Sequence, residues 1–360
     1  MSNVFFKKKN WWLRLSLGEQ LVMIKQLSVL LRAGIPLLSS LRIIEEQSQS
    51  KSQELILKNI VTDVENGQSL AIALGRFKNI FKELTINIIS VGEISGNLSS
   101  NLEHLALTLK KKQALQRKIV GASIYPLFII VATVAITIML IVFVFPKIIP
   151  VFKSIHYQLP WTTRWLIFIS TIMQQYALWL ILCALLLIIA FWLLLKVPKI
   201  TYGLNNTLLS VPFIKTFIQT YNTANLCRTL GLLLVSGVSI VRSFEITSDA
   251  MENVVYKKEL HAVSKALAKG ENISSNLNQC PKLFPIMMSQ MIAVAQTTGN
   301  VGETFSYLAQ VYEEEFDELT KNLSGTIEPF LLIFMGGLVG FVAISIITPI
   351  YGITQHLTPK

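Results

Sequence analysis

The residues from Val91 to Pro146 read VGEISGNLSSNLEHLALTLKKKQALQRKIVGASIYPLFIIVATVAITIMLIVFVFP. A turn rich in Gly, Ser and Asn comes first, followed by a helical pattern, a basic cluster and an unbroken apolar run. This order predicts a water-soluble helical domain that continues directly into a membrane span. The same arrangement returns from Val294 to Pro349 as VAQTTGNVGETFSYLAQVYEEEFDELTKNLSGTIEPFLLIFMGGLVGFVAISIITP, so the chain contains one module twice.

The two copies align without a gap at a constant offset of 203 positions. Glycines, prolines and apolar residues all keep this register, which chance coincidence of a few helix breakers does not explain. The sequence therefore predicts an internal duplication. Equivalent pairs include Gly34/Gly237, Gly67/Gly270, Gly96/Gly299, Asn97/Asn300, Pro126/Pro329 and Pro146/Pro349.

The composition favours a membrane protein. Hydrophobic residues make up 52% of the 360 residues and charged residues only 15%, whereas about a quarter of an ordinary soluble domain is charged. The excess of 32 Lys and Arg over 21 Asp and Glu lies largely beside apolar runs, so lipid and topology explain it better than nucleic acid does. The three cysteines are far apart and indicate neither a disulfide framework nor a metal site.

Three uncharged runs are long enough to cross a bilayer, and they divide the chain into domains. Because two equivalent helical domains with equivalent exit helices must lie on one side, the second span returns the chain to that side. The Lys and Arg residues that flank the runs indicate the cytoplasm. The predicted order is a basic N-terminal segment (1–18), helical domain 1 (19–118), span one (119–146), a short periplasmic loop (147–164), span two (165–195), helical domain 2 (196–327), span three (328–352) and an external tail (353–360).

Apolar spacing predicts six helices in domain 1 and no strand. The helices cover residues 19–33, 36–47, 53–65 and 69–74, a short segment between 81 and 91, and a long segment that continues toward span one. Gly34 and Gly67, with their copies Gly237 and Gly270, stand where a left-handed helix end favours glycine. We expect the residues from Gly92 through Glu93 and Gly96 to Asn97 to form a turn that starts the long helix, with Gly299 and Asn300 in the second copy.

The motifs of enzymes and of cofactor sites are missing from this sequence. It has no GxxxxGK[ST] loop, no HExxH and no GxSxG, and its four histidines show no metal-ligand spacing. The glycine-rich GEISGN lacks the preceding strand and following lysine of a phosphate loop. The sequence therefore predicts no catalytic site, no cofactor, no metal and no nucleic-acid partner.

Three polar features are candidates for function. Glu93 either caps a helix start or joins a divalent-ion site, and its uncharged copy Gln296 favours the cap. Glu328, directly before Pro329, is either a functional carboxylate at the membrane entry or an ordinary interfacial one. A charge inversion is the third feature, and it is either a pair of solvated faces or a contact between juxtamembrane helices, within or between protomers. It matches Lys110, Lys111 and Lys112 with Glu313, Glu314 and Glu315.

Several motifs together resemble the type II secretion protein F family, the inner-membrane platform proteins of type II secretion and type IV pilus assembly machines. The resemblance covers residues 20–351 and rests on LLRAGIPLLSSL and its copy LLVSGVSIVRSF, VGEISGNL, RKIVGASIYP, FPKIIPVF and the closing TPIY. The sequence departs from the family at Ala295 and Gln296, where members commonly carry Gly-Glu, and in its short N-terminal extension.

This resemblance implies an all-α membrane protein with two duplicated cytoplasmic six-helix bundles and three transmembrane helices. It also implies a non-enzymatic homo-oligomer in the bacterial inner membrane. The implied partners are a hexameric secretion or pilus ATPase, pilins or pseudopilins, and other inner-membrane assembly components. Motion would pass through the glycine turns and through kinks at Pro126 and Pro329. A transporter or channel is the alternative, disfavoured by the small number of spans and their few polar residues.

Overall fold

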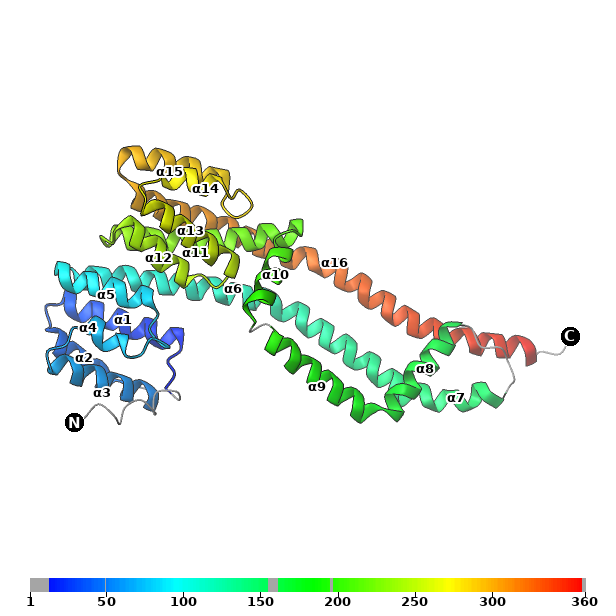
Figure 1. Cartoon of the computed structure of the whole chain (residues 1–360). Coiled ribbons are helices and arrows are strands. Elements are labelled where there is room, and N and C mark those ends of the chain that lie inside the picture. Colours follow the sequence, from blue (N-terminus) through cyan, green and yellow to red (C-terminus); the bar gives the residue numbers. More distant parts are fainter. Residues whose placement is uncertain (1–12, 49, 155–160, 195–196, 358–360) are drawn as a thin grey trace. The chain divides into compact units, whose positions relative to one another are not determined.

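The computed structural model describes residues 13–48, 50–154, 161–194 and 197–357, and every regular element in these ranges is a helix (Figure 1). The predicted all-α fold class is confirmed. The chain forms two compact parts, which we call the helical unit (Met1–Arg117 and Thr201–Glu318) and the apolar unit (Lys118–Ile200 and Leu319–Lys360). Most of the predicted N-terminal segment, the middle of the predicted loop and the last residues of the predicted tail lie outside the described residues.

Each sequence repeat forms six helices, as expected. In repeat 1 these are α1 (Leu17–Arg32), α2 (Leu37–Glu46), α3 (Lys51–Glu65), α4 (Leu70–Gly75), α5 (Glu83–Ser95) and α6 (Leu98–Met139). After α10 (Pro198–Leu208), repeat 2 contains α11 (Pro212–Val235), α12 (Ile240–Ala250), α13 (Val254–Leu267), α14 (Ile273–Asn278), α15 (Ile286–Thr298) and α16 (Val301–Leu357). Along the chain, α6 and α16 each begin in the helical unit and continue into the apolar unit.

Equivalent glycines turn the chain at equivalent corners of the two repeats. The three pairs have left-handed backbone torsions, a region in which a Cβ is strained and glycine is not. Because the same corners need glycine in both copies, the repeats share backbone geometry as well as helix order. The φ angles are 82° and 88° for Gly34 and Gly237, 81° and 86° for Gly67 and Gly270, and 74° and 78° for Gly96 and Gly299.

Each repeat has its own buried core, and the two cores are in contact. Ile24, Leu27 and Phe81 are fully buried or nearly so in repeat 1, as are Phe244 and Phe305 in repeat 2. The cluster around repeat 1 also includes apolar side chains of repeat 2, and α5 of repeat 1 contacts α12 of repeat 2. Burying a large apolar side chain contributes about 1.5–3 kcal/mol, so this shared cluster holds the repeats together. The shared residues of repeat 2 are Leu232, Leu233, Val238 and Ile246.

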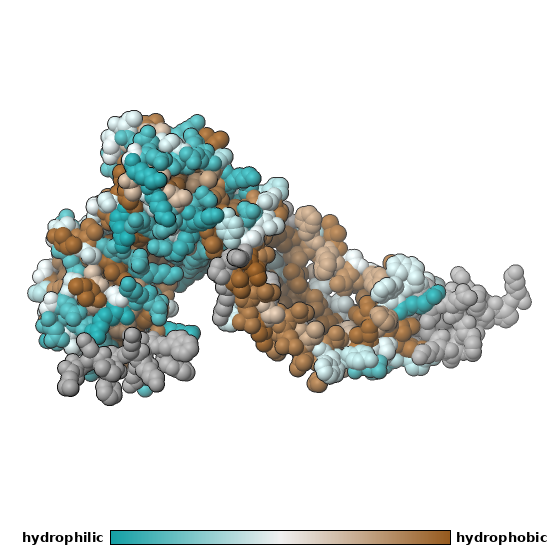
Figure 2. Space-filling model, in the orientation of Figure 1, coloured by the Kyte–Doolittle hydropathy of each residue, from teal (hydrophilic) through white to brown (hydrophobic). Residues whose placement is uncertain are grey.

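Among the residues that the structure describes, three helices are long and apolar enough to cross a membrane. They cover Leu98–Lys147, Ala177–Leu194 and Val301–Thr348, and few residues of their most apolar stretches are buried within the chain. Hydrophobic side chains cover these stretches on the face shown in Figure 2. The predicted number of transmembrane helices is confirmed by length and composition.

The segment between spans one and two differs from the sequence prediction. Helix α7 (Phe145–Ser154) occupies much of the predicted loop, and the predicted second span is divided at Tyr176 into α8 (Trp161–Gln175) and α9 (Ala177–Leu194). Residues 147–154 of the predicted loop are therefore helical, and the external position predicted for this segment stays a prediction. Of α8 and α9, α9 is the one long and apolar enough to span. Helix α8 carries polar residues whose partners lie on other helices, which an uncharged window does not show. Its buried residues include Thr163, Leu166 and Ser170.

A π-helical turn, η2 (Leu140–Val144), interrupts span one and packs against α8. Ser170 Oγ donates to the carbonyl of Ile141 (2.9 Å), and Gln174 Nε2 donates to the carbonyl of Val142 (3.2 Å). These donors satisfy carbonyl groups in the irregular turn, as a low-dielectric environment requires. Pro126 and Pro329 both lie inside continuous helix, and the kinks predicted at these two residues stay a prediction.

Candidate functional site

A buried ion-pair cluster joins the two repeats within the helical unit. Glu313 of α16 is only 7% exposed, and its carboxylate pairs with Arg228 of α11. Lys111 of α6 reaches the same carboxylate, with 3.4 Å between Lys111 Nζ and Glu313 Oε2. One acidic side chain thus contacts one helix of its own repeat and the juxtamembrane helix of the other. We call these three residues the charge cluster.

The electrostatics of the charge cluster follow from its burial. The Arg228 and Glu313 side chains are 11% and 9% exposed, whereas Lys111 is about half exposed at 47%. Burial lowers the pKa of Arg228 to about 10, which still leaves the guanidinium charged at neutral pH. Two charges removed from water stabilise a fold only when paired, and removing either partner is costly. The pair therefore fixes how α11 meets α16.

The predicted charge inversion is only partly a contact in this chain. Lys111 and Glu313 are brought together, and Lys112 instead pairs with Glu252 after α12, at 3.4 Å. Glu315 accepts a hydrogen bond from Thr220 Oγ1 (3.3 Å). Lys110 and Glu314 are exposed.

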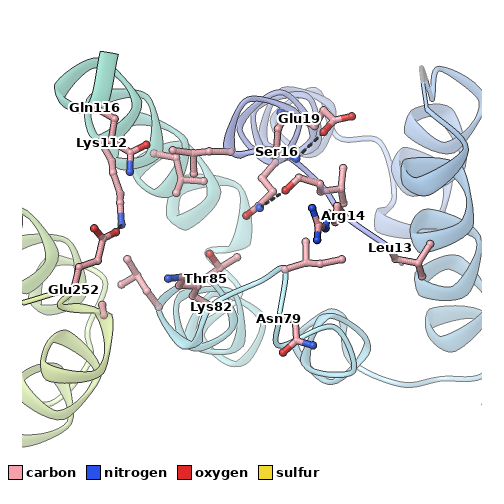
Figure 3. A pocket seen from close by; sticks show the side chains of 17 residues that line it. Leu13, Arg14, Ser16, Glu19, Asn79, Lys82, Thr85, Lys112, Gln116 and Glu252 are labelled. Carbon is pink, nitrogen blue, oxygen red and sulfur yellow. Dashed lines mark hydrogen bonds and ion pairs between the residues drawn. The ribbon is translucent and has the colours of Figure 1, made fainter. Parts of the chain in front are cut away.

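A hollow of about 860 Å³ lies beside this contact, between the start of α1, the start of α5, α6 and the end of α12. Figure 3 shows Lys112 facing Glu252 at one side of the hollow and Arg14 with Glu19 at another. Glu19 is committed to structure: its carboxylate accepts from the backbone N–H of Ser16 (2.7 Å) and from Ser50 Oγ (3.2 Å). The hydrogen bond from the Ser16 backbone is the main cause of the lowered pKa of Glu19.

Glu93 acts as a helix cap in the structure. Its two carboxylate oxygens accept the backbone N–H groups of Leu70 (2.6 Å) and Ala71 (2.9 Å) in the first turn of α4. At the equivalent place, Gln296 Oε1 accepts the backbone N–H of Ser274 (3.0 Å) in α14. A cap needs an acceptor oxygen and not a charge, so both residues serve. The structure places the Glu93 carboxylate on the backbone of α4.

The structure corrects the extent of the predicted turn before α6. Gly92 and Glu93 lie inside α5, and the turn is confined to Gly96 and Asn97, with Gly299 and Asn300 in repeat 2. The carbonyls of both asparagines accept the first helical hydrogen bonds, from Asn101 and Thr304. Gly92 is needed for packing: a Cβ there would lie 3.0 Å from the Cα of Leu98. Helix thus extends further than the glycine spacing suggested.

Glu328 lies on the exposed surface of α16, as does Pro329. No contact of the Glu328 side chain identifies a partner among the described residues, so both sequence interpretations of it stay open. The apolar environment expected at a membrane entry comes from the neighbouring residues of α16, including Phe330, which is 72% exposed.

Sequence reasoning missed two features of this site. Arg228 interrupts the buried stripe of α11 in a stretch of uncharged residues, and that interruption is a signal for a buried ion pair. Gly231 and Gly302 allow α11 and α16 to approach closely. A Cβ at Gly231 would lie 2.5 Å from Ser306 Oγ. In repeat 1 the equivalent helices are joined instead by a hydrogen bond from Ser28 Oγ to the carbonyl of Ser99 (2.9 Å).

The polar contacts of the site join helices to one another. Within the described residues, no group of three or more His, Cys, Asp or Glu side chains is placed to hold a metal ion. Around the hollow, Glu19 accepts hydrogen bonds from a backbone N–H and a hydroxyl, and Lys112 pairs with Glu252, so these contacts fix helices to one another.

Comparisons with known proteins agree with this architecture. The family model described as type II secretion system (T2SS), protein F matches residues 23–146 and again residues 226–349, two segments that start 203 positions apart. A type IV pilus assembly protein PilC of Thermus thermophilus is 33% identical over 334 residues, which cover 93% of this chain and 82% of that protein. A type II secretion system protein F of Aeromonas hydrophila is 30% identical over 338 residues, covering 93% and 86%. With two copies of the family's domain and relatives along nearly its whole length, the chain belongs to the type II secretion system protein F family.

Proposed function

We propose that this chain is an inner-membrane platform of a bacterial type II secretion or type IV pilus assembly machine. Relatives of both kinds are similar along most of their length, so the platform role rests on the whole fold and not on one motif. In this role the chain is a scaffold without a catalytic site. Both bundles lie in the cytoplasm, where they meet a hexameric assembly ATPase.

One observation carries this proposal: α6 and α16 each run without interruption from a packed bundle into an apolar span. Helix α6 covers Leu98–Met139 and α16 covers Val301–Leu357. A continuous helix is stiff along its axis, so a displacement of its bundle end is carried into the membrane. Two such helices, tied together by the charge cluster, form the connection through which ATPase motion reaches a pilin or pseudopilin helix.

The turns at Gly96 and Gly299 are the points at which each long helix joins the rest of its bundle. Both glycines have positive φ, and both turns directly precede the long helices. We propose that these two turns let the bundles tilt while the long helices stay intact. Lipid contacts and other inner-membrane components hold the spans.

Substitution at the turns tests this mechanism. Gly96→Val and Gly299→Val place a β-branched side chain at φ 74° and 78°, and we expect filament assembly or secretion to stop while the protein remains inserted. Gly67→Val is the matched control, because its φ of 81° imposes the same strain at a corner away from α6. Loss of assembly with Gly96→Val but not with Gly67→Val supports the mechanism. Normal assembly in both turn variants, with the protein present at wild-type level, contradicts it.

The proposed topology has its own test. Ser39 and Arg242 are equivalent exposed positions of the two repeats, so cysteines placed there sit on the same side of the membrane if both bundles are cytoplasmic. A membrane-impermeant thiol reagent applied to intact spheroplasts is expected to leave both cysteines unlabelled and to label both after lysis. Labelling of one position in intact spheroplasts would exclude the arrangement.

A further inference from the structure

The two repeats meet through faces that are not equivalent. Repeat 1 contributes α5 and α6, whereas repeat 2 contributes α11 and α12, which correspond in sequence to α1 and α2. Each repeat contains both kinds of face, and this head-to-tail contact uses a different one from each repeat. One copy of each face is therefore left without a partner on the same chain. The unused copies are α15 with α16 in repeat 2, and α1 with α2 in repeat 1.

Exposure of matching residues shows that both copies are open. Leu232 of α11 is 7% exposed in the contact, but its equivalent on α1, Val29, is 59% exposed. Val91 of α5 packs against the repeat 1 core cluster, but its equivalent on α15, Val294, is 63% exposed. We call Val22, Lys25 and Val29 the open α1 face, and Ile286, Met287 and Val294 the open α15 face.

The open α15 face is unusual for a helix of a water-soluble bundle. Helix α15 contains no charged residue, and Ile286, Met287 and Val294 are each about half exposed or more, at 59%, 48% and 63%. On the open α1 face, Val22 is 52% exposed beside Val29. Apolar surface grouped in this way indicates an interaction site.

We propose that a second copy of this chain covers these faces. The open α1 face of one copy packs on the open α15 face of the next, which repeats between chains the contact already made within each chain. The family resemblance implies a homo-oligomer, and this proposal adds to the proposed platform role the two faces through which the copies join. It can fail while that role stands, because its test measures self-association and not secretion.

Charge supports this occupant. Within the chain, Lys111 pairs with Glu313 beside Arg228. By the 203-residue offset, Lys111 corresponds to Glu314, Glu313 to Lys110 and Arg228 to Lys25. In the proposed contact, Glu314 of one copy therefore lies against Lys110 of the next copy, beside Lys25. All three of these side chains are exposed in the single chain. The charge changes sign between Lys111 and Glu314 and between Glu313 and Lys110, so the contact between copies again pairs a lysine with a glutamate. This pairing explains why the lysine and glutamate triplets occupy equivalent positions of the two repeats.

Cross-linking in membranes is the direct test. Two full-length variants are made in a chain with Cys183, Cys227 and Cys280 replaced by alanine, one carrying Lys110→Cys and the other Glu314→Cys. Each variant carries a different tag, and both are expressed together and oxidised mildly. We expect a disulfide-linked pair containing both tags. Lys58→Cys, an exposed lysine on α3, replaces Lys110→Cys in the control and is expected to give none.

Charge reversal and native mass provide independent measurements. In detergent, wild-type protein is expected to be larger than one 40.4-kDa chain. Met287→Glu with Val294→Glu is expected to dissociate it, whereas Ile72→Glu, at a position 61% exposed on α4, is expected to leave the mass unchanged. Glu314→Lys alone weakens self-association, and adding Lys110→Glu to the same chain restores it.

Three results would overturn the proposal. The first is equal cross-linking of the Lys110→Cys and Lys58→Cys variants to Glu314→Cys. The second is a native mass that the α15 substitutions leave unchanged. The third is failure of Lys110→Glu to restore association in the Glu314→Lys chain. The cross-linking arm depends only on surface positions, so it remains decisive if the α15 variant does not fold.

Discussion

Glu93 and Gln296 stand 203 residues apart and bind the same structural feature, the first-turn backbone N–H groups of a short helix. Glu93 accepts two of them in α4, and Gln296 accepts one in α14. The cap holds the short helix against the C-terminal half of α5 or α15. Its function is independent of charge, since an amide oxygen serves in one copy and a carboxylate in the other.

Glu93→Ala is expected to destabilise the protein by about 1–2 kcal/mol, because two N–H groups of α4 lose their acceptor. Glu93→Gln retains an acceptor and is expected to cost less. The thermal unfolding midpoint of the full-length protein in detergent measures both. Equal losses for Ala and Gln would show that the charge, and not the cap, is what the site needs.

The charge cluster predicts that a double substitution costs less folding stability than a single one. Arg228→Met leaves Glu313 buried without its main partner and is expected to cost about 3 kcal/mol. Arg228→Met with Glu313→Leu removes both charges, and we expect stability close to that of the wild type. Lys111 then loses a partner as well, but at 47% exposure this costs little. Unfolding midpoints of the single and double variants test this, and additive losses would contradict it.

Because α11 and α16 approach closely at Gly231, adding one methyl group there is expected to reduce folding stability. The Cβ of Gly231→Ala would lie 2.5 Å from Ser306 Oγ and 2.8 Å from its backbone N, so the helices must separate. We expect a loss of about 1–3 kcal/mol. Gly203→Ala in α10 is the control, because nothing lies within 4 Å of its Cβ. That variant should gain up to about 1 kcal/mol from helix propensity, and a similar loss in both would exclude the packing explanation.

Glu19 predicts an acid-sensitive contribution to stability. The Ser16 backbone N–H holds the pKa of this carboxyl below its ordinary value of 4.5 in the folded protein. A lowered pKa means that the contribution is fully present above pH 4.5 and is lost as the pH falls through the folded-state value. The Glu19→Gln variant cannot titrate at this position, so its stability should fall less than that of the wild type when the pH is lowered. Unfolding midpoints measured between pH 6 and pH 3 check this, and parallel curves for the two proteins would contradict it.

The sequence predicted the corners and the order of the bundle helices well, because glycine and apolar spacing report local geometry. Gly34, Gly67 and Gly96 mark left-handed turns in both copies, as their spacing indicated. Gly92 was misplaced because a glycine needed for close packing looks the same in sequence as one needed for a turn.

Tertiary contacts account for what the sequence did not reveal. The uncharged run at 165–195 contains two helices, and its polar residues Ser170 and Gln174 have meaning only once η2 lies beside them. The lysine and glutamate triplets were visible, but their pairing was not. Lys111 meets Glu313 and not its own equivalent, Glu314.

The π-helical turn at Leu140–Val144 gives span one a different backbone geometry from span three, although the two spans are equivalent in the repeats. Helix α16 is regular over the equivalent residues 343–347, so only span one contains the widened turn. A π turn inserts one residue into the helical phase, which rotates everything after it by about 100°. Beyond this turn, equivalent residues of the two repeats, such as Phe145 and Thr348, no longer lie on corresponding sides of their helices. The two repeats have kept the same glycine corners, but beyond the π turn spans one and three present different residues on corresponding sides.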